Sequence, residues 1–426
     1  MVDGPSATGV YDLNNGVFHR VTMESGLFLR TLDGTVDFCD FHIEEQNFIK
    51  EIVGKHIVDY AATQKARAQT SLEEVVCVSQ SLKFAWIELT SRCNQICLHC
   101  FVGDQLNQFS HVPKEQILEY VDTLIEHGVR KLVLSGGEPT IHPNFEEIVD
   151  YIGHSRVRVS VLSNASHPKV VRFADCFIRN DVKLEVPLLG WNGTHDQMTG
   201  IKGSFEKTKH AIEYFSECGV DLMLGMTVTS LNAQDITLVR AFADKLGLKL
   251  AIDAVYKVGW AEQNCKQLIK TGMQDILRLV KQANKKNYKP LKQRMHIQHR
   301  PEKYAHEPTD YETINLKGHL TEYRDCGQKI VAILSNGDVS PCILLRQPEH
   351  IIGSLKTHTL KQILNRQTLK SEAFDERIRL KNIPSCCVCE ARFICKGSCM
   401  ASAYALTGSI QQKNPLYDGC YYQMQA

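Results

Sequence analysis

Residues 84–100 read FAWIELTSRCNQICLHC, an apolar run that leads directly into three cysteines. These cysteines, Cys93, Cys97 and Cys100, have the spacing C-x3-C-x2-C. Three closely spaced thiolates cannot complete a tetrahedral zinc site alone, because such a site takes four ligands. They can hold three irons of a 4Fe–4S cube and leave the fourth iron open to a chelating molecule. The stretch therefore predicts a strand followed by a metal-binding loop.

Short apolar strands alternate with amphipathic helices from this point onward. We expect strands at 84–89, 131–134, 157–162, 182–188, 221–229 and 249–255. We expect helices at 114–126, 144–152, 168–178, 204–218, 233–246 and 273–284. Six βα units in series predict an α/β fold with parallel strands and helices outside, a partial (β/α)6 barrel of the TIM type. Functional residues should gather at the carboxyl ends of its strands.

Composition excludes several classes of protein. The 426 residues include 49 Lys and Arg against 48 Asp and Glu, a net charge of +1. This balance argues against binding nucleic acid or an anionic membrane by bulk electrostatics. No apolar run approaches the roughly 20 residues of a spanning helix, and the N-terminus lacks the basic and apolar regions of a secretory signal. We expect a soluble, cytoplasmic protein.

Cysteine is over-represented, with sixteen in the chain. This is too few for a disulfide scaffold, and in a reducing cytosol such a surplus more often ligates metal or carries out redox chemistry. A second array, with Gly337 between its first two members, consists of Cys326, Cys342, Cys386, Cys389, Cys395, Cys399 and Cys420. Five others lie singly in apolar or helical contexts, where cysteine packs as a small hydrophobic residue: Cys39, Cys77, Cys176, Cys218 and Cys265.

The first cysteine loop, placed directly after the first strand, resembles the cluster-binding loop of the radical S-adenosylmethionine (SAM) superfamily. The resemblance implies that Cys93, Cys97 and Cys100 bind a 4Fe–4S cluster, and that the amino and carboxylate groups of SAM chelate its open iron. The alternative is a set of incidental or zinc-binding cysteines.

The same resemblance implies a SAM pocket at the ends of the strands. Gly136, Gly137, Glu138 and Pro139 match the family's GGEP motif after the second strand, whose backbone and carboxylate receive the methionine amino group. The other implied contacts are His99 near the adenine, Ser163 and Asn164 at the ribose, and Asn232, which a helix N-cap explains about as well.

The second cysteine array resembles, at every spacing, the SPASM extension of radical SAM enzymes, which holds two auxiliary iron–sulfur clusters. The family's ligation implies a distal cluster on Cys386, Cys389, Cys395 and Cys420 and a proximal cluster on Cys326, Cys342 and Cys399. The fourth proximal ligand is undecided, because Ala332 stands where some members have cysteine: this iron is open, bound by substrate or ligated from elsewhere. We expect Cys387 to be structural. A pair of zinc sites is the alternative, since C-x2-C also begins zinc ribbons.

The first 75 residues form a separate small module. Extended runs at 10–13 and 16–21 flank the turn sequence Asn14-Asn15-Gly16, and helical patterns follow at 24–32 and 44–58. This pattern resembles the winged-helix domains that bind the leaders of ribosomal precursor peptides, although a generic packing or dimerisation module would also explain it. We expect domains at 1–75, 82–290 and 321–426, with 291–320 as a connector whose His296, His299 and His306 are solvated.

Together these resemblances imply an enzyme, a radical SAM peptide maturase with SAM and three 4Fe–4S clusters. It would use a 5′-deoxyadenosyl radical to modify a ribosomally made precursor peptide at an unactivated carbon, with crosslinking favoured over epimerisation or backbone excision. Its partners would be the leader-bearing precursor and a flavodoxin- or ferredoxin-type electron donor. The alternatives are a sulfatase-type protein maturase, a SPASM enzyme acting on a small molecule, and a non-catalytic iron–sulfur electron carrier.

Overall fold

The computed structural model describes residues 1–3, 8–12, 17–32, 45–47, 49–50, 82–155, 157–284, 322–384, 386–389, 392–412 and 414. Several predicted features lie outside these residues: Cys39, Cys77, Cys420, the histidines of the connector, the Asn14-Asn15-Gly16 turn and most of the 44–58 helix. No helix in the described ranges is both long and apolar enough to cross a membrane.

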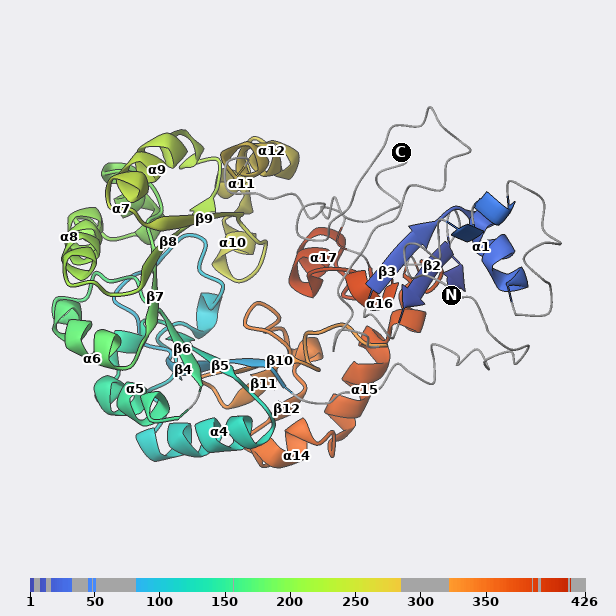
Figure 1. The fold of residues 1–426 in the computed structure, drawn as a ribbon. Coiled ribbons are helices and arrows are strands. Elements are labelled where there is room, and N and C mark those ends of the chain that lie inside the picture. Colours follow the sequence, from blue (N-terminus) through green and yellow to red (C-terminus); the bar gives the residue numbers. More distant parts are fainter. Residues whose placement is uncertain are drawn as a thin grey trace.

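The centre of the molecule is a curved nine-stranded sheet with the order β12-β11-β10-β4-β5-β6-β7-β8-β9 (Figure 1). Its six consecutive parallel strands are β4 (Phe84–Thr90), β5 (Lys131–Gly136), β6 (Arg158–Leu162), β7 (Lys183–Pro187), β8 (Leu222–Val228) and β9 (Lys249–Ala254). All six predicted strands are present in sequential order, so the partial (β/α)6 barrel is confirmed.

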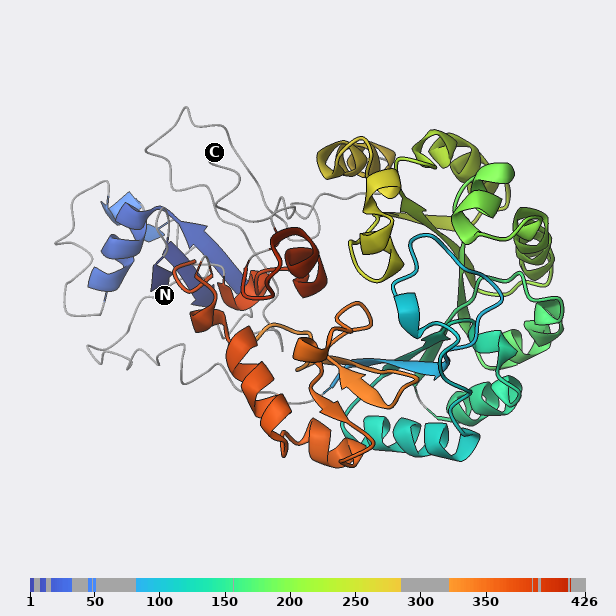
Figure 2. The same ribbon diagram turned by 180° about the vertical axis from the view of Figure 1, so that it is seen from behind.

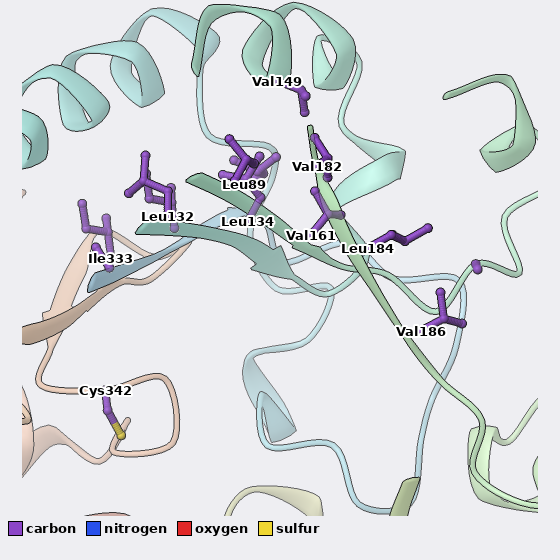
Figure 3. Close-up of a cluster of buried hydrophobic side chains, with 14 of the residues drawn as sticks. Leu89, Leu132, Leu134, Val149, Val161, Val182, Leu184, Val186, Ile333 and Cys342 are labelled. Carbon is purple, nitrogen blue, oxygen red and sulfur yellow. The ribbon is translucent and has the colours of Figure 1, made fainter. Parts of the chain in front are cut away.

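Helices cover the convex side of this sheet (Figures 1 and 2). They are α4 (Lys114–Glu126), α5 (Phe145–Gly153), α6 (Ala174–Arg179), α8 (Ser204–Glu217), α9 (Ile236–Lys245) and α12 (Met273–Asn284). Burial alternates along β8: Leu222, Leu224, Met226 and Val228 are buried, whereas the residues between them are only partly buried. Figure 3 shows this core, in which each fully buried Leu or Val contributes about 1.5–3 kcal/mol.

Within the barrel, residues 82–284, the helices that the sequence pattern missed are short. Two predicted helices begin as 3-10 turns, η4 (Val170–Phe173) before α6 and η5 (Ala233–Asp235) before α9. The unpredicted elements are η2 (Gly103–Gln105), η3 (Pro139–Ile141), α7 (Gly193–Thr199), α10 (Trp260–Gln263) and α11 (Cys265–Leu268). Helices of this length are marginal by themselves and depend on tertiary contacts, which local periodicity does not record.

The C-terminal region continues the barrel sheet. Its elements are β10 (Ile330–Ile333), β11 (Asp338–Ser340), η6 (Pro348–His350), β12 (Gly353–Ser354), α14 (Leu360–Leu364), α15 (Leu369–Ile378), η7 (Leu380–Asn382), α16 (Arg392–Cys395) and α17 (Met400–Thr407). Strands β10 and β11 form a hairpin: they pair antiparallel, and Gly337 takes the φ of +86° that the turn between them requires. Strand β10 also pairs in parallel with β4 and covers that edge of the barrel.

The N-terminal module has its own small antiparallel sheet, with the order β1 (Val2–Asp3), β2 (Thr8–Asp12) and β3 (Val17–Val21). Helix α1 (Met23–Thr31) packs on it. Gly26 permits the close approach, because a Cβ there would lie 2.1 Å from the Thr8 hydroxyl. The predicted strand–strand–helix order is therefore present in the described part of this module.

Candidate functional site

The cysteine loop leaves the carboxyl end of β4, and its three thiols are close enough to influence one another electrostatically. Burial raises the pKa of Cys93 to about 12 and also raises those of Cys97 and Cys100. Thiols in such surroundings stay neutral unless a cation stabilises the thiolate. Three clustered, soft sulfur ligands of this kind fit an iron–sulfur cluster, whose irons supply that charge.

The GGEP turn lies directly against this loop because its glycines have no side chain. A Cβ on Gly136, whose φ is +135°, would lie 2.2 Å from the carbonyl oxygen of Thr90. A Cβ on Gly137 would lie 2.3 Å from that of Arg92. The backbone N–H groups of Gly137 and Glu138 donate to these same two carbonyls at 2.9 and 2.8 Å. The end of β5 and the start of the cysteine loop are thus held as one unit.

The carboxylate of Glu138 is fully buried and accepts four hydrogen bonds from the protein. Its Oε1 accepts from the backbone N–H and hydroxyl of Thr140, at 3.1 and 2.6 Å, and from the Ser163 hydroxyl at 2.8 Å. Its Oε2 accepts from the Asn164 backbone N–H at 2.7 Å. Burial raises the pKa of Glu138, and these donors oppose the rise. The side chain therefore joins the GGEP turn to the end of β6, and Pro139 starts η3 behind it.

Asn164 extends this connection to the cysteines. Its Nδ2 donates to Asn94 Oδ1 at 2.9 Å and lies 3.8 Å from Cys93 Sγ. The backbone N–H of Cys93 is held in turn by Asn107 Oδ1 at 2.9 Å. The predicted residues Cys93, Glu138, Ser163 and Asn164 thus form one continuous network across β4, β5 and β6.

Two histidines near the loop have ring nitrogens that are buried and unpartnered among the described residues. These atoms are Nδ1 of His99 and Nε2 of His195. Burial lowers both pKa values to about 4, so both rings are neutral near pH 7. Nδ1 of His195 accepts from the Leu189 N–H at 3.1 Å, which leaves the proton on Nε2. Such open polar positions beside the cysteines fit a polar cofactor such as SAM. Sequence reasoning identified His99 but missed His195, which lies in the unpredicted α7.

Asn232 occupies a different kind of position. Its Oδ1 accepts from the N–H and hydroxyl of Thr229, and its Nδ2 donates to the carbonyls of Leu189 and Thr227. The side chain is fully buried and makes no capping hydrogen bond to η5. Because its amide groups are saturated within the protein, Asn232 anchors the loops after β7 and β8, and we do not include it in the proposed SAM pocket.

The second cysteine array begins with a close pair, since the neighbouring Cys342 thiol, together with burial, raises the pKa of Cys326. Cys386 and Cys389 are buried, Cys395 is partly buried and Cys399 is exposed. Cys387 donates to the Pro384 carbonyl at 3.1 Å. Ala332 is buried in β10 between Leu334 and Ile343. Within the described ranges no group of three or more His, Cys, Asp and Glu is arranged to hold a metal ion. Such a group would hold a single ion, whereas the ligands of a 4Fe–4S cube bind separate irons and lie farther apart.

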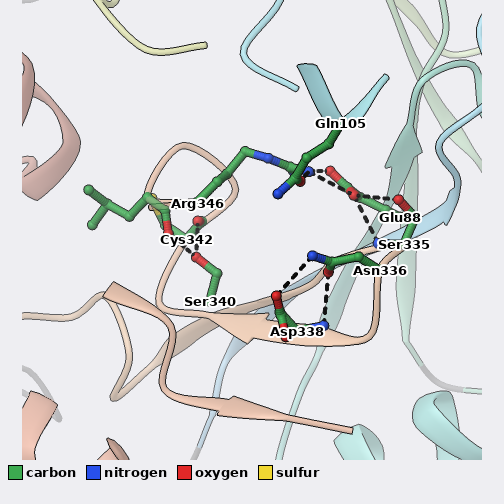
Figure 4. A network of polar contacts seen from close by, with 9 residues as sticks. Glu88, Gln105, Ser335, Asn336, Asp338, Ser340, Cys342 and Arg346 are labelled. Carbon is green, nitrogen blue, oxygen red and sulfur yellow. Dashed lines mark hydrogen bonds and ion pairs between the residues drawn. The ribbon is translucent and has the colours of Figure 1, made fainter. Parts of the chain in front are cut away.

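A buried ion pair that sequence reasoning did not find joins the two cysteine regions (Figure 4). Glu88, on β4, is bound by the Arg346 guanidinium and by the N–H of Ser335, the latter at 3.0 Å. Arg346 also donates to Gln105 Oε1 at 2.6 Å, and electrostatically it is within reach of Cys100. The only local indication was a carboxylate inside the otherwise apolar 84–90 strand.

Two protein families match the ranges that contain the first cysteine loop and the start of the second cysteine array. Residues 87–242 match the family described as the Radical SAM superfamily, and residues 325–390 match SPASM, described as an iron-sulfur cluster-binding domain. Over 155 residues the chain is 31% identical to the antilisterial bacteriocin subtilosin biosynthesis protein AlbA of Bacillus subtilis, which covers 36% of this chain and 34% of that protein. The chain thus aligns with about a third of AlbA.

One further relative and one solved structure align over most of the chain. An AdoMet-dependent heme synthase of Methanosarcina barkeri is 25% identical over 349 residues, 80% of this chain and 96% of that protein. The crystal structure of Streptococcus suis SuiB bound to precursor peptide SuiA has the same fold over 98% of this chain and 99% of that chain, with a TM-score of 0.58 and 13% identity. The chain therefore carries a radical SAM domain over residues 87–242 and a SPASM domain over residues 325–390.

Proposed function

We propose that the chain is a radical SAM peptide maturase with three 4Fe–4S clusters, and that it modifies a ribosomally made precursor peptide at an unactivated carbon. When bound, SAM and the reduced first cluster supply a 5′-deoxyadenosyl radical able to remove hydrogen from such a carbon. The observation that carries the proposal is the single network that ties the cysteine loop to the GGEP turn and to Ser163 and Asn164.

The described residues have distinct tasks in this proposal. Cys93, Cys97 and Cys100 hold the first cluster. Gly136 and Gly137 bring the backbone of the GGEP turn next to it, and the methionine amino group of SAM binds at this turn. Glu138 fixes Ser163 and Asn164, and the open nitrogen of His99 is available to the adenine. In this proposal, the buried residues around these groups exclude water from the carbon of the peptide that reacts.

Auxiliary clusters suit an oxidative outcome. In the proposed ligation Cys326, Cys342 and Cys399 hold the proximal cluster, and Cys386, Cys389 and Cys395 hold the distal cluster together with Cys420, which lies outside the described residues. A net two-electron crosslink leaves one electron to be removed from the substrate radical, and an auxiliary cluster can accept it. A flavodoxin- or ferredoxin-type protein would supply the initial electron.

The N-terminal module is the proposed recognition element. Strand β3 pairs only with β2 among the described strands, so its other edge can accept a peptide leader as an added strand. SuiB, whose structure with a precursor peptide is known, has a similar fold over 98% of this chain, which supports this proposal. The proposed domain limits are 1–75, 82–290 and 321–426, with a connector at 291–320.

The test is turnover of the precursor peptide encoded beside the gene, with reconstituted enzyme, SAM and a reductant under anaerobic conditions. A crosslinked product lacks two hydrogens by mass spectrometry and is accompanied by 5′-deoxyadenosine. Deletion of residues 1–75 should preserve iron content and basal SAM cleavage but abolish turnover, because the target no longer dwells near the radical at high effective concentration. Full turnover by the truncated enzyme would eliminate the leader-binding role.

A second candidate is action on a small molecule. The heme synthase of Methanosarcina barkeri aligns with 80% of this chain, more than AlbA does. A tetrapyrrole-type substrate would need no leader, so deletion of residues 1–75 would leave its turnover intact. Incubation of both forms of the enzyme with iron coproporphyrin and with the precursor peptide separates the two candidates.

A further inference from the structure

Arg324 is the largest fully buried side chain of the described residues, with 1% of its surface exposed. It stands two positions before Cys326, at the start of the C-terminal cysteine array. Buried arginines are usually paired with a carboxylate, because an uncompensated charge inside a protein is strongly unfavourable. The surroundings of Arg324 depart from that rule.

Within the described residues, the guanidinium of Arg324 donates its hydrogen bonds to neutral backbone carbonyls. Nη1 donates to Ile410 O and Gln412 O at 2.5 and 3.1 Å. Nη2 donates to Gly397 O and Ser398 O at 2.7 and 3.0 Å. These carbonyls satisfy donors but carry no charge. In the same part of the chain, Nε is buried with no partner at all.

The neighbouring acid is already occupied by other cations. Asp325 Oδ1 lies 2.8 Å from Lys396 Nζ and 3.7 Å from Lys329 Nζ. No ion pair joins Arg324 to any carboxylate in the part of the chain that the structure describes. The positive charge of Arg324 therefore has to be balanced by something other than a described acid.

Cysteine thiols are the charge-bearing neighbours of the guanidinium instead. A Cβ on Gly397 would lie 3.2 Å from Cys386 Sγ and 3.4 Å from Arg324 Cζ, so the thiol and the guanidinium border the same small space. Burial lowers the pKa of Arg324, whereas four thiols raise it: Cys386, Cys326, Cys399 and Cys395. Arginine remains protonated in proteins. The charge thus faces cysteines of both proposed auxiliary clusters.

We propose that Arg324 is the buried counter-ion of the auxiliary-cluster thiolates, a positioning residue that raises the reduction potential of these clusters. A fixed cation stabilises the reduced, more negative form of a cluster more than the oxidised form. Charge and hydrogen bonding around the sulfurs are established levers on such potentials. This inference rests on the proposed function only in requiring that the auxiliary clusters bind.

Arg324 also has a structural task that the test must separate from its charge. The backbone at Lys396, Gly397 and Ser398 is left-handed, with φ of +53°, +69° and +59°. Two of its carbonyls are held by Arg324. A substitution of Arg324 that loses these hydrogen bonds can alter the turn between Cys395 and Cys399, whether or not the new side chain is charged.

Two variants divide these tasks. Arg324→Lys keeps the positive charge but loses the planar fork, whereas Arg324→Gln loses the charge and keeps a polar donor. Arg379→Gln is the matched control, because Arg379 belongs to the same module but pairs with Glu322 at 2.8 Å. Iron and sulfide analysis of the wild-type protein comes first. Absence of auxiliary iron there would refute both this inference and the cluster count of the proposed function.

The readout is a redox titration of the auxiliary clusters followed by electron paramagnetic resonance. At a fixed potential, Arg324→Gln should lower the ratio of reduced to oxidised cluster about tenfold, equivalent to a shift of about 59 mV for one electron. Arg324→Lys and Arg379→Gln should stay within about twofold of the wild type. Equal potentials in loaded wild-type and Arg324→Gln protein would refute the inference and leave the proposed function standing.

A second measurement, of the unfolding temperature, applies to a variant that binds too little iron for a redox titration. In metal-free protein the charge of Arg324 is uncompensated, so metal loading should raise the unfolding temperature more in the wild type than in Arg324→Gln. A purely structural role instead predicts that the substitution destabilises the metal-free and loaded forms equally. That result would overturn the inference even if no titration were possible.

Discussion

Replacement of Glu138 by Gln tests the centre of the proposed SAM site with a change of one atom. Glu138 Oε2 accepts the Asn164 backbone N–H at 2.7 Å, and Oε1 accepts three further hydrogen bonds. A glutamine in the same place can offer only one oxygen, so its NH2 group faces a donor. Because Oε1 has the larger set of donors, we expect the amide oxygen to stay there and the bond to Asn164 to be lost.

The expected magnitude follows from that single bond. A buried hydrogen bond to a charged group contributes about 1.5–3 kcal/mol. If the whole of this free energy is lost from SAM binding, because Asn164 no longer holds its position, SAM affinity falls on the order of tenfold to a hundredfold. Cluster content should stay intact, because Cys93, Cys97 and Cys100 keep their backbone supports. Ser163→Ala removes another donor to the same carboxylate, so we expect a loss of similar size, about 1.5–3 kcal/mol, in the free energy of SAM binding.

The assay is anaerobic calorimetric titration of reconstituted protein with SAM, with iron measured on the same samples. Glu147→Gln serves as the control, because Glu147 is an exposed glutamate that contacts Lys114 at 2.6 Å, in a surface ion pair between helices α4 and α5. Unchanged SAM affinity in Glu138→Gln with full cluster content would show that the carboxylate does not position the pocket.

Three further predictions address the clusters, the ion pair and pH. Cys100→Ala should lower iron from about twelve to about eight per chain and abolish 5′-deoxyadenosine formation, as measured by iron analysis and chromatography. Arg346→Met should lower the free energy of unfolding in urea by about 3–5 kcal/mol, because it leaves the carboxylate of Glu88 buried without its partner. His195 has a pKa of about 4 when folded against 6.5 when unfolded, so its contribution to stability is constant above pH 6.5 and declines as pH falls towards 4. We expect a loss of about 2 kcal/mol between pH 7 and pH 5 that His195→Gln removes, and an equal pH dependence in both proteins would contradict this.

The barrel was predictable because its signals are local and repeated. The helix Lys114–Glu126 was predicted with the same bounds, since Pro113 precedes an amphipathic run that ends at His127-Gly128. Helix α7 was missed because it has only seven residues and no apolar stripe. It is held from outside, where the carbonyls of Met198 and Thr199 accept N–H groups of the cysteine loop at 2.9 and 3.0 Å.

The candidate site was likewise predictable only in part. Its motifs were visible in the sequence, since cysteine spacing and the GGEP turn are patterns of neighbouring residues. Their connections were not: Glu138 was expected to face SAM directly, whereas its carboxylate accepts hydrogen bonds from Thr140, Ser163 and Asn164. Arg346 and Glu88 are 258 positions apart, and only the fold brings them together.

The parallel pairing of β10 with β4 also makes completion of the sheet depend on the progress of synthesis. Glu88 and Ser335, which are hydrogen-bonded across this junction, lie 247 residues apart. A ribosome that adds about 5–20 residues per second needs roughly 12–50 s to cover that distance. Throughout this interval the edge of β4 has no partner, and the cysteine loop that follows it stays open to the machinery that delivers iron and sulfide. The topology thereby leaves an interval in which the first cluster can be assembled before the C-terminal module closes the barrel edge.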